Sequence, residues 1–299
     1  MKASVIVMDY LRKKYILDAL QSIKNQKGID LNDIEVIVIK YYQDEKIDNY
    51  IKENFPNYKI INLDPNGPDR YCGPELAIGI KEASSNLIFI LDDDDMFTEN
   101  KISRIFEVVK NIKYDEYLIF HKVMIIQDDK ERPLKKPKYT IGTNNSSMIL
   151  NIKDKNKLID YLRKIYYILD VGLLCYFNKR AIKLDEPLTY YRRHEENLTG
   201  KKYNRQTLEM LLQDLQYIYK KTKCKGQIYG IISYKILLNL IYNANYKISL
   251  KEYLECLLIF DRNYIKRLTK IILYKLFRNY LKKYYLKKFI FEDLNIQNV

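Results

Sequence analysis

Short apolar blocks alternate with segments whose apolar residues recur every three or four positions over the first part of the chain. The blocks predict buried strands, and the spaced pattern predicts amphipathic helices. The predicted strands cover 4–8, 35–39, 58–63 and 87–91, and helices are predicted over 16–23, from 47, over 74–83 and from 99. This alternation indicates an α/β fold with a mostly parallel sheet flanked by helices and right-handed crossovers.

The order of elements is looser in the second part of the chain. A long strand is predicted over 117–126, a polar loop over 128–138, a turn or binding loop over 143–147, and one helix over 158–177. Leucines and an isoleucine at helical spacing over 208–218 predict an amphipathic helix. Gly226 and Gly230 are expected to break that pattern, with further helices up to about residue 290.

Four consecutive aspartates, Asp92 to Asp95, directly follow the apolar strand at 87–91. Adjacent carboxylates repel one another, so a cation or a bound proton is needed among them. Mg²⁺ is usually held by one or two carboxylates together with substrate phosphates. Residues two apart in an extended segment project to the same side, so Asp92 and Asp94 are expected to face one ion. The alternative is a solvated turn that caps the following helix.

Charge divides the chain near residue 200. Residues 1–200 hold 32 Lys and Arg against 31 Asp and Glu, whereas residues 201–299 hold 20 against 7. We therefore expect a near-neutral domain over 1–200 and a helical, basic C-terminal extension over 201–299.

Cysteine usage and hydropathy bear on the compartment. The four cysteines are scattered without metal-ligand spacing, which is typical of reduced thiols. Neither a signal peptide nor an apolar run of membrane-spanning length is recognisable. These features predict a cytoplasmic protein, either fully soluble or peripheral at the inner face of the membrane.

Four motifs in register resemble one known family. They are the strand and helix over 4–26, the strand over 35–39, the stretch from Gly79 to the aspartates, and the segment 185–194, which reads Asp-Glu-Pro-Leu-Thr-Tyr-Tyr-Arg-Arg-His. Together they cover about residues 3–200 and are similar to the family 2 glycosyltransferases, which have the GT-A fold. The resemblance implies an α/β domain that binds a nucleotide sugar and carries a D-x-D metal motif.

The resemblance also implies roles for particular residues. Asp92 and Asp94 would hold Mn²⁺ or Mg²⁺ bound to the donor diphosphate. Asp92 and Asp93 would also contact the donor itself. An inverting member uses a carboxylate base some way before the segment 185–194, and Asp170 stands there. The alternative for Asp170 is a solvated aspartate at a helix end.

Arg192, Arg193 and His194 form a compact cationic group. The resemblance places the corresponding arginine and histidine, here assigned to Arg192 and His194, near the donor phosphates. An arginine fork matches phosphate oxygens bidentately. The alternative is that an arginine of this group pairs with Glu195 or Glu196 at the surface.

The chain departs from the family around the nucleoside. Lys40-Tyr41-Tyr42-Gln43 stands where members commonly read Asp-Asp-Gly-Ser, and Glu75-Leu76-Ala77 replaces Ala-Arg-Asn. Either the donor base is recognised differently or the donor site has degenerated. We hypothesise that Asp9 accepts from a base or ribose group, and that Tyr10 or Tyr41 stacks on the base.

Residues 263–290 alternate apolar positions with nine lysines and arginines. Such basic amphipathic helices lie well on anionic membranes, which suits a lipid-linked acceptor. A helical bundle with a solvated lysine face is the structural alternative. Nucleic acid is the least favoured partner, because no nucleic-acid motif accompanies the charge.

The sequence therefore favours a metal-dependent inverting glycosyltransferase that moves a sugar from a nucleoside-diphosphate sugar to a hydroxyl acceptor, either a glycan or a lipid-linked one. A sugar-phosphate nucleotidyltransferase is disfavoured, because the first strand is followed by no glycine-rich loop. A degenerate transferase that acts as a non-catalytic binding or membrane-associated scaffold is the non-enzymatic alternative. The sequence does not identify the donor sugar, the base, the acceptor or the oligomeric state.

Overall fold

The computed structural model describes residues 2–10, 13–127, 138–141, 144–194, 197, 204–242 and 244–257. The chain divides into two compact units, Met1–Glu196 and Asn197–Val299. Three predicted features lie outside the described residues. They are the basic segment 263–290, residues 128–137 of the polar loop, and Glu195 and Glu196, which were considered as partners of an arginine.

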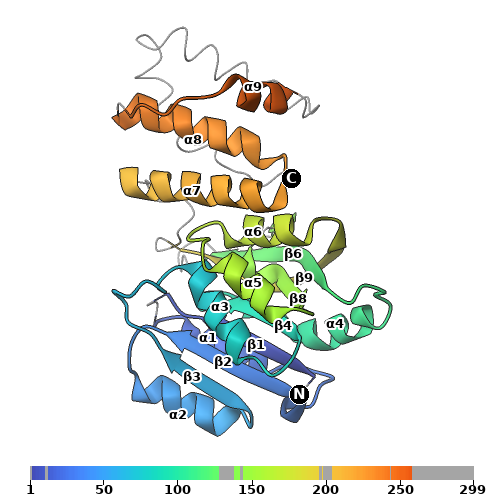
Figure 1. Cartoon of the computed structure of the whole chain (residues 1–299). Helices are drawn as coiled ribbons and strands as arrows, with labels where there is room; N and C mark the ends of the chain where they lie inside the picture. The colour runs from blue at the N-terminus through green and yellow to red at the C-terminus, as the bar shows by residue number, and fades with distance from the viewer. Residues whose placement is uncertain are drawn as a thin grey trace. The chain divides into compact units, whose positions relative to one another are not determined.

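The first unit alternates strands and helices, as predicted for an α/β domain (Figure 1). Its strands are β1 (Ala3–Met8), β2 (Ile34–Lys40), β3 (Tyr58–Asn62), β4 (Leu87–Asp92), β5 (Met96–Phe97), β6 (Tyr117–Gln127), β7 (Lys138–Ile141), β8 (Met148–Asn151) and β9 (Ala181–Arg193). Its α-helices are α1 (Ile16–Lys24), α2 (Glu45–Asn54), α3 (Cys72–Glu82), α4 (Lys101–Val109), α5 (Lys155–Leu162) and α6 (Leu169–Phe177). Short 3₁₀ helices are η1 (Leu31–Asp33), η2 (Asn145–Ser147) and η3 (Asn178–Arg180).

The described strands form one sheet in the order β3-β2-β1-β4-β8-β6-β9-β5, with β7 on β6. Strands β3, β2, β1 and β4 are parallel, which confirms the predicted parallel sheet in this half. The other half adds the antiparallel pairs β4–β8 and β8–β6 before the parallel pair β6–β9. The carboxyl ends of β1, β2 and β4 therefore share one edge, where ligands of such sheets bind.

Helices cover both faces of the parallel half because its residues alternate between two cores. Val5, Val7 and Phe89 belong to the core that α1, α2 and α4 complete. On the other face α3 packs so closely that a Cβ built on Gly79 would lie 2.7 Å from Ile6 Cγ2. The direction of each crossover decides which face a helix covers.

One expected helix proves to be two. Residues 158–177 were predicted as a single helix, but α5 ends at Leu162 and α6 begins at Leu169. The reason is tertiary: α3 and α5 lie side by side (Figure 1), and a Cβ on Gly73 would meet the carbonyl oxygens of Leu162 and Ile165 at 2.3 and 2.2 Å. The chain turns there to keep this contact.

The second unit contains α7 (Arg205–Thr222), α8 (Gln227–Tyr242) and α9 (Leu250–Leu257). The stripe over 208–218 is buried in α7, as predicted. The prediction that Gly230 breaks the pattern is wrong, because Gly230 lies inside α8. A Cβ at this position would lie 2.8 Å from Leu215 Cδ1, so the glycine permits close packing of α7 on α8. Within the described part of the chain, no helix has both the length and the apolar character needed to cross a membrane.

Candidate active site

The aspartates lie at the carboxyl end of β4, next to β1. Asp92 is the last residue of the strand, and residues 93 and 94 form a turn. One carboxylate oxygen from each of Asp92, Asp94 and Asp95 lies within 4.8 Å of the others. Asp94 and Asp95 are buried and Asp92 is half-buried. Asp92 and Asp94 were expected to face one ion because side chains alternate along a strand. The turn at 93 and 94 instead brings Asp95 together with them.

This carboxylate cluster has the composition of a site for a hard divalent cation. Burial, and then the charge of Asp94, raise the pKa of Asp95 to about 7. A cation among the three side chains would relieve this repulsion and replace the proton. Oxygen ligands of this kind suit Mg²⁺ or Mn²⁺.

Arg192, on β9, fixes the backbone around the cluster. Its N–H donates to Asp95 Oδ1 at 3.0 Å, and its Nε donates to the carbonyl oxygen of Asp94 at 3.1 Å. Its Nη2 pairs with Asp18 Oδ2 at 2.7 Å, and the guanidinium carbon lies 4.8 Å from the centroid of the Tyr15 ring. The guanidinium is thus oriented by α1, β9 and the aspartate turn together.

His194 follows β9 and touches the cluster directly. Its Nε2 lies 2.9 Å from Asp94 Oδ2, and only 4% of its side chain is exposed. Its ring centre is 4.7 Å from that of Tyr15. The structure therefore brings two members of the predicted cationic group, Arg192 and His194, to the aspartates.

A loop that the sequence did not connect with the aspartates holds two of them. Asn144 Nδ2 donates to Asp95 Oδ2 at 2.8 Å, and Asn145 Nδ2 lies 3.3 Å from both Asp92 carboxylate oxygens. Ser146 Oγ accepts the N–H of Asp92 at 2.9 Å. The composition of 143–147 indicated a turn or binding loop, but no spacing in the sequence links it to residues some fifty positions earlier.

Asp9 and Asp93 are buried at the same edge of the sheet. Asp9 is fully buried after β1, and its Oδ2 accepts a hydrogen bond from the Tyr42 hydroxyl. The N–H of Asp93 donates to the carbonyl oxygen of Met8 at 3.0 Å. Tyr10 is half-buried beside them. Their roles toward a donor stay predictions.

The positions that depart from the family have structural partners here. Lys40 is fully buried, and its Nζ contacts the carbonyl oxygen of Tyr42 at 2.7 Å and Asp48 Oδ1 at 3.0 Å. Leu76 and Ala77 are core residues of α3. Tyr41 is buried, and its hydroxyl donates to the carbonyl oxygen of Asp69 at 3.0 Å. The replaced positions therefore serve packing and local hydrogen bonds.

Glu75 adds a buried acid on α3. The side chain is fully buried. Burial, followed by the charges of Asp92 and Asp93, raises the pKa of Glu75 well above its ordinary value. A further carboxyl group, favoured in its protonated form, therefore lies near the end of β4 in addition to the three clustered aspartates.

Asp170 stands in the first turn of α6, half-buried. Its Oδ1 accepts the N–H of Val171 at 2.8 Å. Two contacts hold this region: the Tyr161 hydroxyl donates to the carbonyl oxygen of Gly172 at 2.9 Å, and Cys72 Sγ donates to that of Tyr166 at 2.9 Å. The catalytic role of Asp170 stays a prediction.

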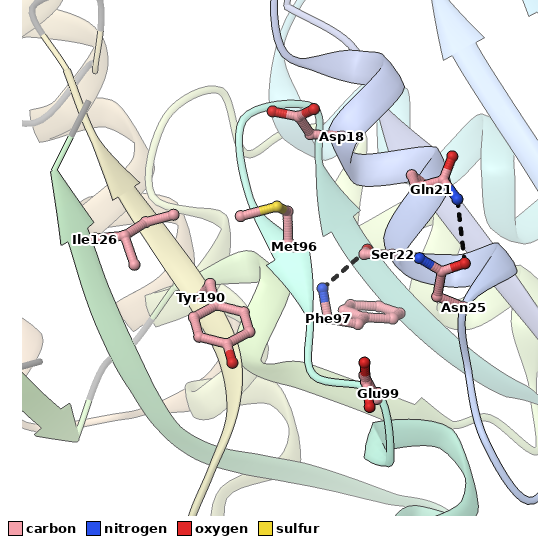
Figure 2. Close-up of a pocket in the computed structure, with 9 residues that line it drawn as sticks. All are labelled: Asp18, Gln21, Ser22, Asn25, Met96, Phe97, Glu99, Ile126 and Tyr190. Carbon is pink, nitrogen blue, oxygen red and sulfur yellow. Dashed lines mark hydrogen bonds between the residues drawn. The ribbon is translucent and has the colours of Figure 1, made fainter. Parts of the chain in front are cut away.

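A cavity of about 340 Å³ opens beside the aspartate turn (Figure 2). Met96, Phe97, Ile126 and Tyr190 supply its apolar lining, and α1 supplies polar groups along its side. None of the predicted site residues lines it. Asp18 connects the two places, because it lines the cavity and pairs with Arg192.

Solved structures share this fold. Residues 1–349 of TarS from S. aureus match with a TM-score of 0.54 at 17% identity, over 85% of this chain and 77% of that one. The same protein in complex with UDP-GlcNAc matches with a TM-score of 0.56 at 18% identity, over 85% of this chain and 78% of that one. At such identities the likeness establishes the GT-A fold alone. No curated protein matches the sequence significantly.

The sequence itself matches a family model. The model for glycosyl transferase family 2 aligns with residues 4–167, which include the aspartate cluster and, apart from Ala3, the four parallel strands. This match covers more than half of the chain. The chain therefore belongs to glycosyl transferase family 2 and is a glycosyltransferase.

Proposed function

We propose that the chain is a metal-dependent, inverting transferase that moves a sugar from a nucleoside-diphosphate sugar to a hydroxyl group. The carboxylate cluster of Asp92, Asp94 and Asp95 carries the proposal, because its oxygens converge within 4.8 Å at the edge where such sheets bind ligands. These residues would hold Mn²⁺ or Mg²⁺. Such a cation would neutralise the charge that develops on the leaving diphosphate.

A uridine diphosphate sugar is the proposed donor. TarS, which shares the fold, was crystallised with UDP-GlcNAc and with UDP. In this chain Arg192 and His194 would lie toward the phosphates, because both contact the aspartate turn. The rest of the donor site is assigned to Asp93, which follows β4, and to Asp9 and Tyr10, which follow the neighbouring strand β1.

Asp170 is the proposed base. It would take the proton of the acceptor hydroxyl while that oxygen attacks the anomeric carbon from the side opposite the diphosphate. A single displacement of this kind inverts the configuration at that carbon. The start of α6, tied to α3 and α5, gives the carboxylate a fixed position.

The proposed acceptor is a glycan or a lipid-linked molecule. The basic segment 263–290, whose spacing suits an anionic membrane surface, supports a peripheral location at the inner face. Nucleic acid remains the least favoured partner.

A scaffold without catalysis is the alternative function. Tyr42 engages Asp9, and Lys40 is held by Asp48, so two positions near the nucleoside are committed to internal contacts. A scaffold needs neither donor turnover nor Asp170.

Donor hydrolysis tests the proposal without knowledge of the acceptor, because water can replace it. We expect Mn²⁺-dependent release of UDP from UDP-GlcNAc, reduced about 10²–10⁴-fold by Asp170→Asn. UDP binding should persist in that variant, and Asp160→Asn on the exposed face of α5 is the matched control. Unchanged hydrolysis in Asp170→Asn would contradict the assigned base, and no hydrolysis of any nucleotide sugar by the unaltered protein would favour the scaffold.

A further inference from the structure

A fully buried lysine lies beneath the loop that holds the aspartates. Lys101 is the first residue of α4, and none of its surface is exposed. Its Nζ donates to the carbonyl oxygen of Ser146 at 2.6 Å and to Thr189 Oγ1 at 3.0 Å, and it lies 3.7 Å from the centre of the Phe97 ring. Thr189 Oγ1 donates to the same Ser146 oxygen at 3.0 Å.

Burying an ammonium group costs stability, so its contacts must offset the loss of hydration. Burial lowers the pKa of Lys101 well below its ordinary value, and the charge of Asp95 opposes that shift. An apolar side chain of similar length would fill the space without this cost. The lysine thus supplies what an apolar residue lacks, namely donors to the loop at Ser146.

The loop transmits this anchoring to the carboxylates. Three consecutive residues, 144 to 146, each contact an aspartate of the cluster: Asn144 contacts Asp95, whereas Asn145 and Ser146 contact Asp92. Displacing the Ser146 carbonyl would shift all three contacts together. Partners of this kind orient ligating carboxylates, and their loss typically weakens metal binding.

We propose that Lys101 is a positioning residue: it fixes the 144–146 loop through Ser146 and thereby sets the orientation of Asp92 and Asp95 toward a divalent cation. The inference rests on the proposed metal-dependent function. Lys101 touches neither cation nor donor in this account, so it acts only through the loop.

The affinity for Mn²⁺ tests the inference. Binding is measured by titration of the folded protein with MnCl₂, following the electron paramagnetic resonance signal of unbound Mn²⁺, alone and with UDP. We expect Lys101→Met to weaken Mn²⁺ binding about 10–100-fold. Thr189→Val, which keeps the side-chain shape but removes one partner of Lys101 and one of Ser146, should weaken it in the same direction.

Thr98→Val is the matched control. Thr98 is also buried, and its Oγ1 contacts Asn100 Oδ1 at 3.1 Å and the carbonyl oxygen of Leu188 at 3.3 Å, neither of which belongs to the 144–146 loop. Lost stability with normal Mn²⁺ affinity in folded Lys101→Met and Thr189→Val would overturn the inference and leave the proposed function intact. Thr189→Val carries the test if Lys101→Met does not fold. Failure of the unaltered protein to bind Mn²⁺ would overturn both.

Discussion

Glu75 shows how strongly single residues are perturbed at the ligand edge of the sheet. It is fully buried, and burial together with Asp92 and Asp93 raises its pKa. A carboxyl group whose pKa rises on folding favours the folded state below its unfolded pKa, and this contribution is lost as the pH rises through the folded value. Glu75 therefore costs stability at neutral and alkaline pH.

Replacing Glu75 by Gln should raise the unfolding temperature, and by more at about pH 8 than at about pH 5, because Gln resembles the protonated acid. Thermal unfolding in EDTA at both pH values measures the difference. Glu82→Gln, at the half-exposed end of the same helix, is the matched control. Equal shifts of Glu75→Gln at both pH values would contradict the raised pKa.

Prediction from sequence was uneven at this scale. The four adjacent aspartates after an apolar strand indicated their chemistry directly, and the structure gathers three of them. The sequence does not indicate a role for Lys101, because its partners Ser146 and Thr189 lie 45 and 88 positions away along the chain. Only folding brings such side chains together.

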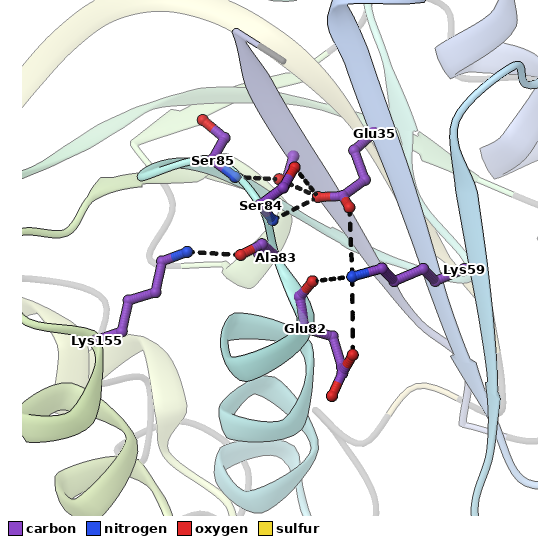
Figure 3. Close-up of polar contacts among 8 residues, drawn as sticks. Glu35, Lys59, Glu82, Ala83, Ser84, Ser85 and Lys155 are labelled. Atoms are coloured by element: carbon purple, nitrogen blue, oxygen red, sulfur yellow. Dashed lines mark hydrogen bonds and ion pairs between the residues drawn. The ribbon is translucent and has the colours of Figure 1, made fainter.

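At the scale of elements, a buried carboxylate joins several strands at the end of the sheet opposite the aspartates (Figure 3). Glu35 Oε2, on β2, accepts from Ser4 Oγ at 2.6 Å, Ser84 N at 2.8 Å and Ser84 Oγ at 3.0 Å. Lys59 Nζ, on β3, lies 3.6 Å from Glu35 Oε1. These contacts connect β1, β2, β3 and the segment between α3 and β4.

Burial would raise the pKa of Glu35, but the hydrogen bonds from Ser4 and Ser84 and the charge of Lys59 outweigh it and lower the pKa. A lowered pKa contributes stability above the unfolded pKa, and this is lost as the pH falls through the folded value. Glu35→Gln should therefore cost about 1–3 kcal/mol at neutral pH.

Urea unfolding from about pH 7 down to about pH 3.5 measures this, and the difference from the unaltered protein should shrink below the unfolded pKa of the carboxyl group. Glu82→Gln serves again as the control on the same network, with a half-exposed side chain. A pH-independent cost would show that packing, not the charge of Glu35, carries the effect.

The elements themselves were predictable where the apolar period was sustained. The four parallel strands and helices α1 to α4 lie where the pattern placed them. Strands β5, β7 and β8 were missed, because two to four residues carry too little pattern. No bounds were predicted for β9 either, although it has 13 residues. The break between α5 and α6 depends on contact with Gly73, which local spacing does not encode.

At the scale of the whole molecule, charge is concentrated in the second unit. Residues 201–299 hold 20 basic against 7 acidic residues. We expect the segment 263–290 to bind anionic vesicles, with each lysine near the surface contributing about 1 kcal/mol. Replacing Lys282, Lys283, Lys287 and Lys288 by Gln should abolish co-sedimentation with phosphatidylglycerol vesicles at physiological salt.

A matched variant distinguishes the effect of where the lysines lie in the sequence from the effect of the net charge of the protein. Gln at the exposed Lys220, Lys221, Lys223 and Lys225 removes the same number of charges around the end of α7. This variant should keep binding. Equal loss in both variants would show a diffuse charge effect, and no binding by the unaltered protein would favour a purely structural role for the segment.

The thermal stability of the protein with Mn²⁺ and UDP, added separately and together, tests the proposed donor site most directly. A ligand that binds only the folded state stabilises it by about 2.7 kcal/mol at 100 times its dissociation constant. We predict that UDP raises the unfolding temperature only with Mn²⁺, that Asp94→Ala abolishes this shift, and that the exposed Asp115→Ala keeps it. No Mn²⁺-dependent shift with UDP, GDP, CDP or dTDP would contradict the proposed donor site.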